Sequence, residues 1–323
     1  MKALKYSQIC LSPKYSECYS RADCDTRVEL CGEKFRLPII PANMKSVISM
    51  PLSKLMSQSG YFYIMHRFDN SLKQVVSQMN EENWDIISVS MGVKLKDKKD
   101  IVALSKYKQR IDYITIDIAH GHSARMKSAI DCVKKHMPET KIIAGNVTTS
   151  SAVLDLARWG ADVVKVGIGQ GSPCTTKDKT GFTMPMFSCT QWCSNVFKDE
   201  ESILPIPIIA DGGIKCNGDI AKAIVAGATM VMAGGIFAAC TDSPAVASTV
   251  NNVPYKAYFG SASAENKGHQ KHIEGKLTNI ISNGMTYQSK LEEIKQDIQS
   301  SISYSGGEDI SSLASVEYHE CMD

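Results

Sequence analysis

Short apolar runs alternate with segments of helical periodicity along most of the chain. Each run is rich in Ile, Val or Tyr and nearly continuously apolar, as strands buried on both faces of a parallel sheet are. Eight strands are predicted, at residues 38–41, 61–65, 86–90, 113–118, 141–144, 162–166, 207–210 and 230–233. Helical spacing with terminal Gly or Pro residues predicts helices at 53–57, 71–80, 99–109, 123–136, 150–159 and 217–226.

This alternation predicts an α/β fold in which helices cover a parallel sheet. Eight strand–helix units in 323 residues favour a closed (β/α)8 TIM barrel over an open doubly wound sheet. The long connection at 167–205 contains a glycine-rich loop and a predicted helix near 190–197, so we expect no inserted domain. The prediction is a single barrel domain over residues 1–323.

Polar residues and glycines collect directly after the predicted strands. Asn43, Arg67, Asp117 and Asn146 follow four of them, and glycines follow others. Barrel enzymes carry their chemistry at the carboxyl ends of the strands. This pattern favours an enzyme over a structural protein.

The loop at 167–176, Gly-Ile-Gly-Gln-Gly-Ser-Pro-Cys-Thr-Thr, follows the sixth predicted strand. Alternate glycines let the backbone bring N–H groups close to an anion or carbonyl groups close to a cation, and Cys174 follows within a few residues. One interpretation is a nucleophile beside a bound ligand. The other, a glycine-rich turn with an incidental buried cysteine, stays open from this loop alone.

Two further glycine pairs follow the last two predicted strands, at 212–213 and 234–235. Backbone N–H groups at these places form the usual phosphate grip of a TIM barrel. Asp211, beside the first pair, is suited to accept hydrogen bonds from a ribose. The alternative is a helix cap at Asp211 and simple tight turns at the glycines.

The chain changes character after the eighth predicted strand. Residues 258–263 are small and hydroxyl-rich, and the polar stretch 264–276 lacks an apolar period. We expect a mobile flap over the barrel mouth at about 264–280. An amphipathic helix is predicted at 289–301, within a C-terminal helix and tail at 289–323 whose last dozen residues are expected to be loosely held.

The balance of 36 Lys and Arg against 34 Asp and Glu gives no reason to expect a nucleic-acid or membrane partner. The N-terminus lacks the apolar core of a signal peptide, so the expected location is the cytoplasm. The 11 cysteines are then expected to be mostly reduced. Cys189 and Cys193 have helical spacing, but a zinc site is not expected because no further ligands lie nearby in the sequence.

Three motifs together resemble the IMP dehydrogenase and GMP reductase family. They are Gly-Ile-Gly-x-Gly-Ser-x-Cys-Thr-Thr at 167–176, Ala-Asp-Gly-Gly-Ile at 210–214 and Tyr-Phe-Gly-Ser-Ala-Ser at 258–263. Further matches at 41–44, 117–121 and 273–276 occur in order, so the resemblance covers nearly the whole chain. The cysteine loop is highly specific for the family, whereas the double-glycine loops are not.

In two features the chain resembles the reductase branch of this family: no inserted domain is expected, and the flap has no Arg-Tyr pair. Its dehydrogenases usually carry an inserted regulatory domain and a flap with an Arg-Tyr pair that activates water, and residues 264–276 contain neither Arg nor Tyr. The resemblance implies NADPH-dependent reductive deamination of GMP to IMP and ammonia in purine salvage, through a covalent cysteine thioimidate. The alternatives are an IMP dehydrogenase that makes XMP with NAD, a non-catalytic purine nucleotide-binding barrel, or a flavin-dependent barrel oxidoreductase.

The resemblance also implies roles for single residues. Cys174 would attack purine C2, and Thr176 with Glu274 would relay a proton to the departing ammonia. Alone, Thr176 would more often be a capping residue and Glu274 a solvated charge. The implied substrate-binding residues are Ser172, Asp211, Gly212, Gly213, Gly234, Gly235, Gly260, Ser261 and Ala262.

The cofactor implied by the resemblance is NADPH, with far contacts that cross to a neighbouring subunit of a homotetramer. The implied cofactor-binding residues are Ser20, Arg21, Arg67, Asp117, Ile118, Ala119, Gly167, Ile168, Ser261, Gln270, Lys271, Ser300, Ser301, Ile302 and Ser303. A potassium site is implied at Gly169, Gly171, Cys174 and Lys177.

Four positions depart from the pattern of the family. Gln170 stands where proline is common, Pro173 where a branched apolar residue is, and Lys177 where arginine is more usual. These changes alter the stiffness of the loop next to the potassium site. Ala264 lies where related chains often carry an acid, and the sequence alone gives no account of its consequence.

Overall fold

A parallel sheet forms the centre of the molecule in a computed structural model that describes residues 2–198 and 204–321. Its strands lie in the spatial order β4-β10-β9-β8-β7-β6-β5. Their bounds are β4 (Ile39–Pro41), β5 (Ser88–Met91), β6 (Tyr113–Asp117), β7 (Lys141–Val147), β8 (Val163–Val166), β9 (Ile208–Asp211) and β10 (Met230–Ala233). These strands confirm seven of the eight predicted runs, since each run is apolar enough to be buried on both faces.

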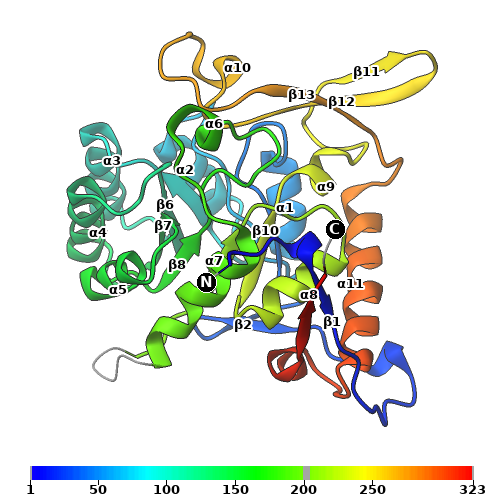
Figure 1. The fold of residues 1–323 in the computed structure, drawn as a ribbon. Coiled ribbons are helices and arrows are strands. Elements are labelled where there is room, and N and C mark those ends of the chain that lie inside the picture. Colours follow the sequence, from blue (N-terminus) through cyan, green and yellow to red (C-terminus); the bar gives the residue numbers. More distant parts are fainter. Residues whose placement is uncertain (1, 199–203, 322–323) are drawn as a thin grey trace.

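Helices cover the sheet, α3 to α5 on one side and α8 with α11 on the other (Figure 1). The longer helices are α1 (Met50–Gln58), α2 (Leu72–Glu81), α3 (Leu95–Lys106), α4 (Ala124–His136), α5 (Ser150–Trp159), α7 (Met186–Asn195), α8 (Gly218–Val225) and α11 (Tyr287–Tyr304). The shorter ones are α6 (Thr176–Thr180), α9 (Gly235–Ala238) and α10 (Ala264–Lys267). Their order along the chain confirms the TIM-barrel prediction.

The strand predicted at 61–65 is wrong as a regular ladder strand. Within this segment, only Met65 makes a bridge, with Val89 of β5. Aromatic packing holds the segment instead, because the Phe62 ring lies 5.0 Å from Phe35 and 4.9 Å from Tyr113. The segment lies beside β5 and takes the remaining strand position of the barrel.

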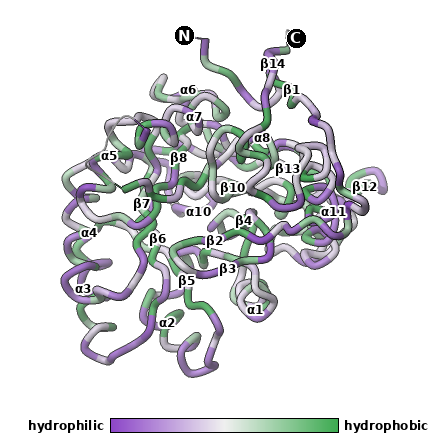
Figure 2. The backbone as a smooth tube through the Cα atoms, turned by 90° about the horizontal axis from the view of Figure 1, so that it is seen from below, coloured by the Kyte–Doolittle hydropathy of each residue, from purple (hydrophilic) through white to green (hydrophobic). Residues whose placement is uncertain are grey.

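Burial separates the two faces of the covering helices. Val75, Val76 and Met79 are buried on α2, and Ile130 and Val133 are buried on α4. Figure 2 shows hydrophobic colours along the strands and hydrophilic ones on the outer turns of α3 and α4. The core is therefore the layer between the sheet and these helices.

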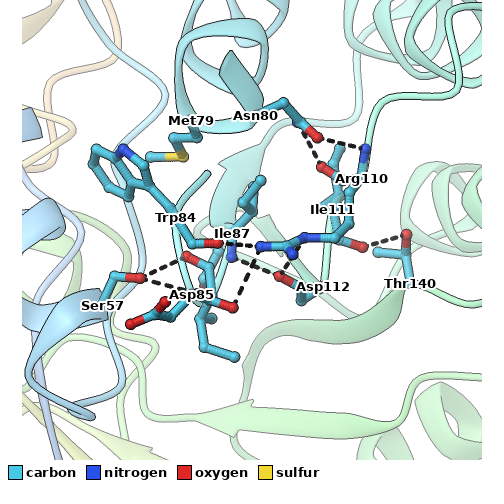
Figure 3. A network of polar contacts seen from close by, with 12 residues as sticks. Ser57, Met79, Asn80, Trp84, Asp85, Ile87, Arg110, Ile111, Asp112 and Thr140 are labelled. Atoms are coloured by element: carbon cyan, nitrogen blue, oxygen red, sulfur yellow. Dashed lines mark hydrogen bonds and ion pairs between the residues drawn. The ribbon is translucent and has the colours of Figure 1, made fainter. Parts of the chain in front are cut away.

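A polar network closes the end of the barrel where β5 and β6 begin (Figure 3). The Asp112 carboxylate accepts a 2.7 Å hydrogen bond from the Ile87 N–H and pairs with the Arg110 guanidinium at 3.3 Å. Arg110 also donates to the Trp84 carbonyl, and its own N–H donates to Asn80 Oδ1 at 3.0 Å. Because this network lies opposite the carboxyl ends of the strands, we attribute it to stability.

A small antiparallel sheet stands over the mouth of the barrel, at the top of Figure 1. Strands β11 (Ala247–Val250) and β12 (Val253–Phe259) are joined by Asn251 and Asn252, both with positive φ, as in a type I′ hairpin. Strand β13 (Leu277–Ile281) pairs with β12. The last residues of the flap predicted at about 264–280 therefore belong to this sheet, as part of β13.

The two ends of the chain also meet, which contradicts the predicted loose tail. Strand β1 (Ile9–Leu11) pairs with β14 (Tyr318–Glu320), and the Tyr318 ring packs edge-on against Phe187 at 4.6 Å. A 3-10 helix at Ile310–Ser315 precedes β14. Strands β2 (Val28–Leu30) and β3 (Glu33–Phe35) form a second short hairpin before β4.

Candidate active site

A cavity of about 400 Å³ opens at the carboxyl ends of the barrel strands. Its walls come from the loops after β4, β6, β8, β9 and β10, together with Tyr258, residues 260–262 and Glu274. The predicted site residues that line it are Arg67, Asp117, Ile118, Ala119, Gly167, Ile168, Gly169, Gly171, Ser172, Cys174, Thr176, Asp211, Gly212, Gly213, Gly234, Gly235, Gly260, Ser261, Ala262 and Glu274. One cavity thus brings together residues that lie more than 200 positions apart in the sequence.

Cys174, Thr176 and Glu274 form a hydrogen-bonded row on the cavity wall. The Cys174 thiol donates to Thr176 Oγ1 at 3.3 Å, and that hydroxyl donates to Glu274 Oε2 at 2.8 Å. Cys174 is only partly buried, so its sulfur is open to a ligand, whereas Thr176 is 8% exposed. The row joins a thiol to a carboxylate through a hydroxyl, an arrangement that can pass a proton.

Backbone contacts fix the two segments that carry this row. Cys174 and Gly275 form an antiparallel bridge, and the Thr175 N–H donates to the Glu274 carbonyl at 2.8 Å. The Lys276 N–H donates to the Pro173 carbonyl, also at 2.8 Å. Backbone hydrogen bonds between residues 173–175 and 274–276 therefore fix the position of the Glu274 carboxylate, although Glu274 belongs to the predicted flap.

Lys165 of β8 lies at the floor of the cavity and joins two predicted site carboxylates. Its ammonium lies 3.0 Å from Asp117 Oδ1 and 2.6 Å from Asp211 Oδ2, and its side chain is 2% exposed. Asn43 donates to Asp117 at 3.0 Å, and Asn146 donates to Asp211 at 2.8 Å. The two carboxylates are thus oriented by a shared cation and by one amide each.

The charges in this cluster support one another. Burial alone would raise the pKa of Asp117, but the Lys165 ammonium and the Asn43 amide outweigh it and lower this pKa below its ordinary value. Burial alone would lower the pKa of Lys165, and the two carboxylates raise it instead. Lys165 and Asp117 therefore stay charged at neutral pH.

Glycines around the cavity keep space for a ligand and for a neighbouring ring. Gly212 and Gly213 have φ values of +107° and +80°, a conformation that other residues rarely adopt. A side chain at Gly234 would collide with the Tyr258 hydroxyl, and one at Gly275 would lie 2.8 Å from the Ser263 nitrogen. Such close approach is typical of a backbone cradle for phosphate.

Some polar residues of the cavity had no role from the sequence, among them Lys165, Asn146, Tyr258 and Lys267. A lysine inside the apolar run Val163–Val166 was the available signal, since a charge in a buried strand requires partners. The Tyr258 hydroxyl is buried, and burial raises its pKa, with Asp211 and Cys174 adding to the effect. Tyr258 therefore stays protonated and can donate a hydrogen bond into the cavity.

The remaining predicted cofactor residues lie outside the cavity, in two places. Ser20, Arg21 and the Ser300–Ser303 turn of α11 meet on one surface, where Arg21 lies over the Tyr304 ring at 5.3 Å and 3.5 Å from Ser300 Oγ. Gln270 and Lys271 lie exposed in the flap. Ile302 is fully buried in the core, so its side chain cannot contact a ligand.

The departures from the family pattern have structural partners. Gln170 donates to Thr183 Oγ1 at 2.6 Å, and this hydroxyl donates to the Ile168 carbonyl at 2.9 Å. Pro173 supplies the carbonyl that binds the flap at Lys276. Ala264 begins α10, whose N-cap is Ser263. Side-chain bonding thus stiffens the loop where proline would otherwise do so.

The potassium site that the resemblance implies would use backbone oxygen atoms of this loop. The Gly171 carbonyl accepts a 3.0 Å hydrogen bond from the Cys174 N–H, which leaves a second lone pair for a cation. Gly169 lies next to Lys177, since a Cβ at Gly169 would be 3.3 Å from that of Lys177. The residues present fit an ion held by backbone oxygen atoms.

Cys189 and Cys193 of α7 lie buried side by side. The pKa of the Cys189 thiol is raised by its hydrogen bond with Cys193 and by burial. Within residues 2–198 and 204–321, no group of His, Cys, Asp and Glu side chains could hold a metal ion. The same residues contain no helix long and apolar enough to cross a bilayer.

The barrel, the cysteine loop and the charged floor define the class of protein. The chain belongs to the IMP dehydrogenase/GMP reductase family, whose domain model matches residues 3–321. It is an enzyme of the oxidoreductase class.

Particular relatives are GMP reductases of bacteria. The GMP reductase of Acidovorax ebreus (strain TPSY) is 45% identical over 320 residues, which cover 98% of this chain and 96% of that protein. The GMP reductase of Helicobacter pylori (strain G27) is 45% identical over 321 residues, with coverages of 98% and 96%. The GMP reductase of Mesoplasma florum is 44% identical over 321 residues, with 98% of each chain covered.

Proposed function

We propose that this chain is a GMP reductase, which converts GMP to IMP and ammonia with NADPH as the reductant. The observation that carries the proposal is the hydrogen-bonded row from Cys174 through Thr176 to Glu274 on the wall of the cavity. Full-length identity of about 45% to GMP reductases supports the choice of substrate.

Cys174 acts as the nucleophile in this proposal. Its thiolate attacks C2 of the purine, the C–N bond to the 2-amino group breaks, and a thioimidate between Cys174 and the purine remains. An amide anion is a very poor leaving group, so the amine must leave protonated. The Thr176 hydroxyl passes the proton, and Glu274, 2.8 Å away, restores it.

When bound, NADPH supplies the hydride that reduces C2. Departure of the Cys174 thiolate then releases IMP. Asp117, Ile118, Ala119, Gly167, Ile168 and Arg67 would hold the nicotinamide end, and all of them line the cavity. Ser20, Arg21, Ser261, Gln270, Lys271, Ser300, Ser301 and Ser303 would hold the far end, those outside the cavity across a homotetramer interface.

The substrate would lie between the charged floor and the glycine cradle. Asp211, oriented by Lys165 and Asn146, accepts hydrogen bonds from the ribose hydroxyls. Backbone N–H groups at Gly213, Gly234 and Gly235 bind the phosphate, with Ser172 and residues 260–262 closing around it. Potassium bound by Gly169, Gly171 and Cys174, next to Lys177, would stabilise the conformation of the cysteine loop. We expect the protein to melt at a higher temperature in KCl than in LiCl if this site is present.

Steady-state assays in both redox directions test the reaction. We expect NADPH absorbance to fall with GMP and no NADH to appear with IMP and NAD, because the flap at 264–276 lacks the Arg-Tyr pair. NADH formation from IMP would identify a dehydrogenase instead. If GMP binds without turnover and Cys174→Ala leaves the affinity for GMP unchanged, the barrel is a non-catalytic nucleotide binder. A yellow colour of the purified protein would indicate a flavin-dependent oxidoreductase.

The relay is tested by Thr176→Val, which keeps the volume and removes the hydroxyl. We expect kcat to fall by about 10²- to 10⁴-fold while GMP affinity is retained. Intact-mass measurement after an acid quench should show a purine adduct on Cys174 in the active protein. Thr180→Val is the matched control, because the Thr180 hydroxyl donates to the Thr176 carbonyl and accepts from the Phe182 N–H, away from the Cys174 thiol.

A further inference from the structure

Two thiols outside the cavity face each other near the N-terminus. Cys18 Sγ and Cys24 Sγ lie 3.5 Å apart; Cys18 is partly exposed and Cys24 is 4% exposed. The segment between them carries Ser20 and Arg21 and includes the short helix Arg21–Asp23. A disulfide bond is about 2.05 Å long, so a shift of about 1.5 Å would join the two sulfurs.

We propose that Cys18 and Cys24 form a dithiol site that is reversibly oxidised to a disulfide by a low-molecular-weight disulfide such as oxidised glutathione. The site is separate from Cys174, and the proposed catalytic cycle does not use it. It rests on the contact between the sulfurs, on the access to Cys18 and on the way the surrounding backbone is anchored.

The order of the exchange follows from burial. Burial raises the pKa of Cys24 to about 11, and the adjacent Cys18 sulfur adds to this, so Cys24 stays protonated near neutral pH. Cys18 therefore attacks first, forms a mixed disulfide and releases one small thiol. Cys24 then loses its proton to solvent and attacks the Cys18 sulfur, which releases the second small thiol.

Cys24 is the fixed partner of the pair. Its carbonyl accepts a 3.1 Å hydrogen bond from the Gln299 amide, and the next residue, Asp25, donates its N–H to the Glu308 carbonyl at 2.7 Å. Cys18 is held by lighter contacts, a 3.2 Å bond from its N–H to Ser16 Oγ and a 3.3 Å bond from its thiol to the Ser20 carbonyl. Closure therefore moves Cys18, and it removes the thiol that donates to Ser20.

Oxidation thus acts on the surface where Arg21 meets Ser300 and Tyr304. Under the proposed function this surface binds the far end of NADPH, and this consequence rests on that proposal. The Ser20–Arg21 segment is displaced from its reduced arrangement, so we expect a higher KM for NADPH. We expect kcat to stay unchanged, since Cys174 and the cavity are not touched.

Peptide mapping tests the disulfide without any assay of activity. Trypsin cleaves after Lys14, Arg21 and Arg27, so each cysteine falls in its own peptide, 15–21 or 22–27. After incubation of the whole protein with oxidised glutathione and blocking of remaining thiols, we expect the two peptides to appear joined, and to separate on reduction. Cys10 and Cys321, whose sulfurs lie 2.9 Å apart, fall in other peptides.

Two variants control the experiment. Cys18→Ser should abolish the joined peptide and leave glutathione absent from Cys24, whereas Cys216→Ser, at an exposed cysteine elsewhere, should leave it unchanged. Separate peptides in the oxidised wild-type protein, or glutathione retained on Cys18, would overturn the proposal.

The KM arm compares wild-type protein with Cys18→Ser after identical oxidation with GMP present to shield Cys174. A rise in KM in the wild type alone supports the coupling to the cofactor surface. An equal KM in both removes that coupling and leaves the disulfide standing. Absence of any turnover in the reduced protein would count against the proposed function, and the peptide result is independent of it.

Discussion

The ammonium of Lys165 is the only cation in the described part of the chain that contacts both Asp117 and Asp211. It therefore links the wall expected to hold the cofactor with the carboxylate expected to hold the ribose. A buried carboxylate without such a partner would take up a proton or lose its orientation. The polar floor depends on this one side chain.

Lys165→Met leaves a fully buried strand position without its charge and two partly buried carboxylates without their cation. We expect the free energy of unfolding to fall by about 3–5 kcal/mol, as for other broken buried pairs. Urea denaturation followed by circular dichroism measures the change. Lys127→Met removes an exposed partner of Asp131 and should change stability by less than about 1 kcal/mol. Equal effects of the two substitutions would contradict the role of Lys165.

The lowered pKa of Asp117 makes a prediction about pH. Because the folded-state pKa lies below the ordinary Asp value, the stability that ionised Asp117 contributes is complete above about pH 4 and is lost as the pH falls through the lower folded value. Asp117→Asn lacks this contribution. Below about pH 4, wild-type stability should therefore fall more steeply than that of the variant. Parallel pH profiles would refute this assignment.

At the residue scale, the sequence predicts the motif residues that line the cavity better than the residues that orient them. Cys174, Thr176 and Glu274 belong to motifs with fixed spacing, and they meet on the cavity wall. Lys165 and Tyr258 were not given roles, because their contacts are made through space by separate strands. A motif states which residues are neighbours in sequence, and it does not state what packs behind them.

At the scale of elements, apolar runs predicted seven sheet strands, since burial on both faces requires such runs. The mouth sheet escaped prediction because β11 is exposed along its whole length and shows no alternation. The segment at 61–65 has the apolar sequence of a sheet strand because it is buried. Burial alone gives the same apolar pattern whether or not a segment pairs regularly with its neighbours. In that segment the aromatic contacts of Phe62 replace the ladder.

Gly275→Ala tests how β13 and the flap place Glu274. The added methyl would lie 2.8 Å from the Ser263 nitrogen, a backbone atom that cannot easily move, so the bridge to Cys174 should break. We expect activity to fall at least about tenfold with little change in the melting of the barrel. Gly218→Ala, where nothing lies within 4 Å, is the matched control. Full activity in Gly275→Ala would show that the bridge is dispensable.

At the scale of the whole molecule, the chain ends are part of the barrel assembly. Tyr318 packs against Phe187 of α7 and accepts a 3.1 Å hydrogen bond from Gln191. Sequence reading expected a loose tail because the last dozen residues have no strong apolar period. The pairing of β14 with β1 is a contact between distant parts of the sequence, and no local sequence pattern predicts it.

Tyr318→Ala removes the ring that anchors the C-terminal strand. We expect a loss of about 1–3 kcal/mol in the free energy of unfolding, from the aromatic contact and the hydrogen bond together. Chemical denaturation measures it. Tyr107→Ala, at a tyrosine that is 74% exposed, should stay within about 0.5 kcal/mol of wild type. A similar value for Tyr318→Ala would mean that the tail contributes nothing.

The main-chain bridge between Cys174 and Gly275 ties the proposed nucleophile to a thin layer outside the barrel. That layer is mostly exposed, so it melts locally at a lower free-energy cost than the core beneath it. Warming should therefore silence turnover while the helices and the central sheet still give their full circular dichroism signal. Cooling should bring the turnover back, because the barrel that guides the layer into place never came apart.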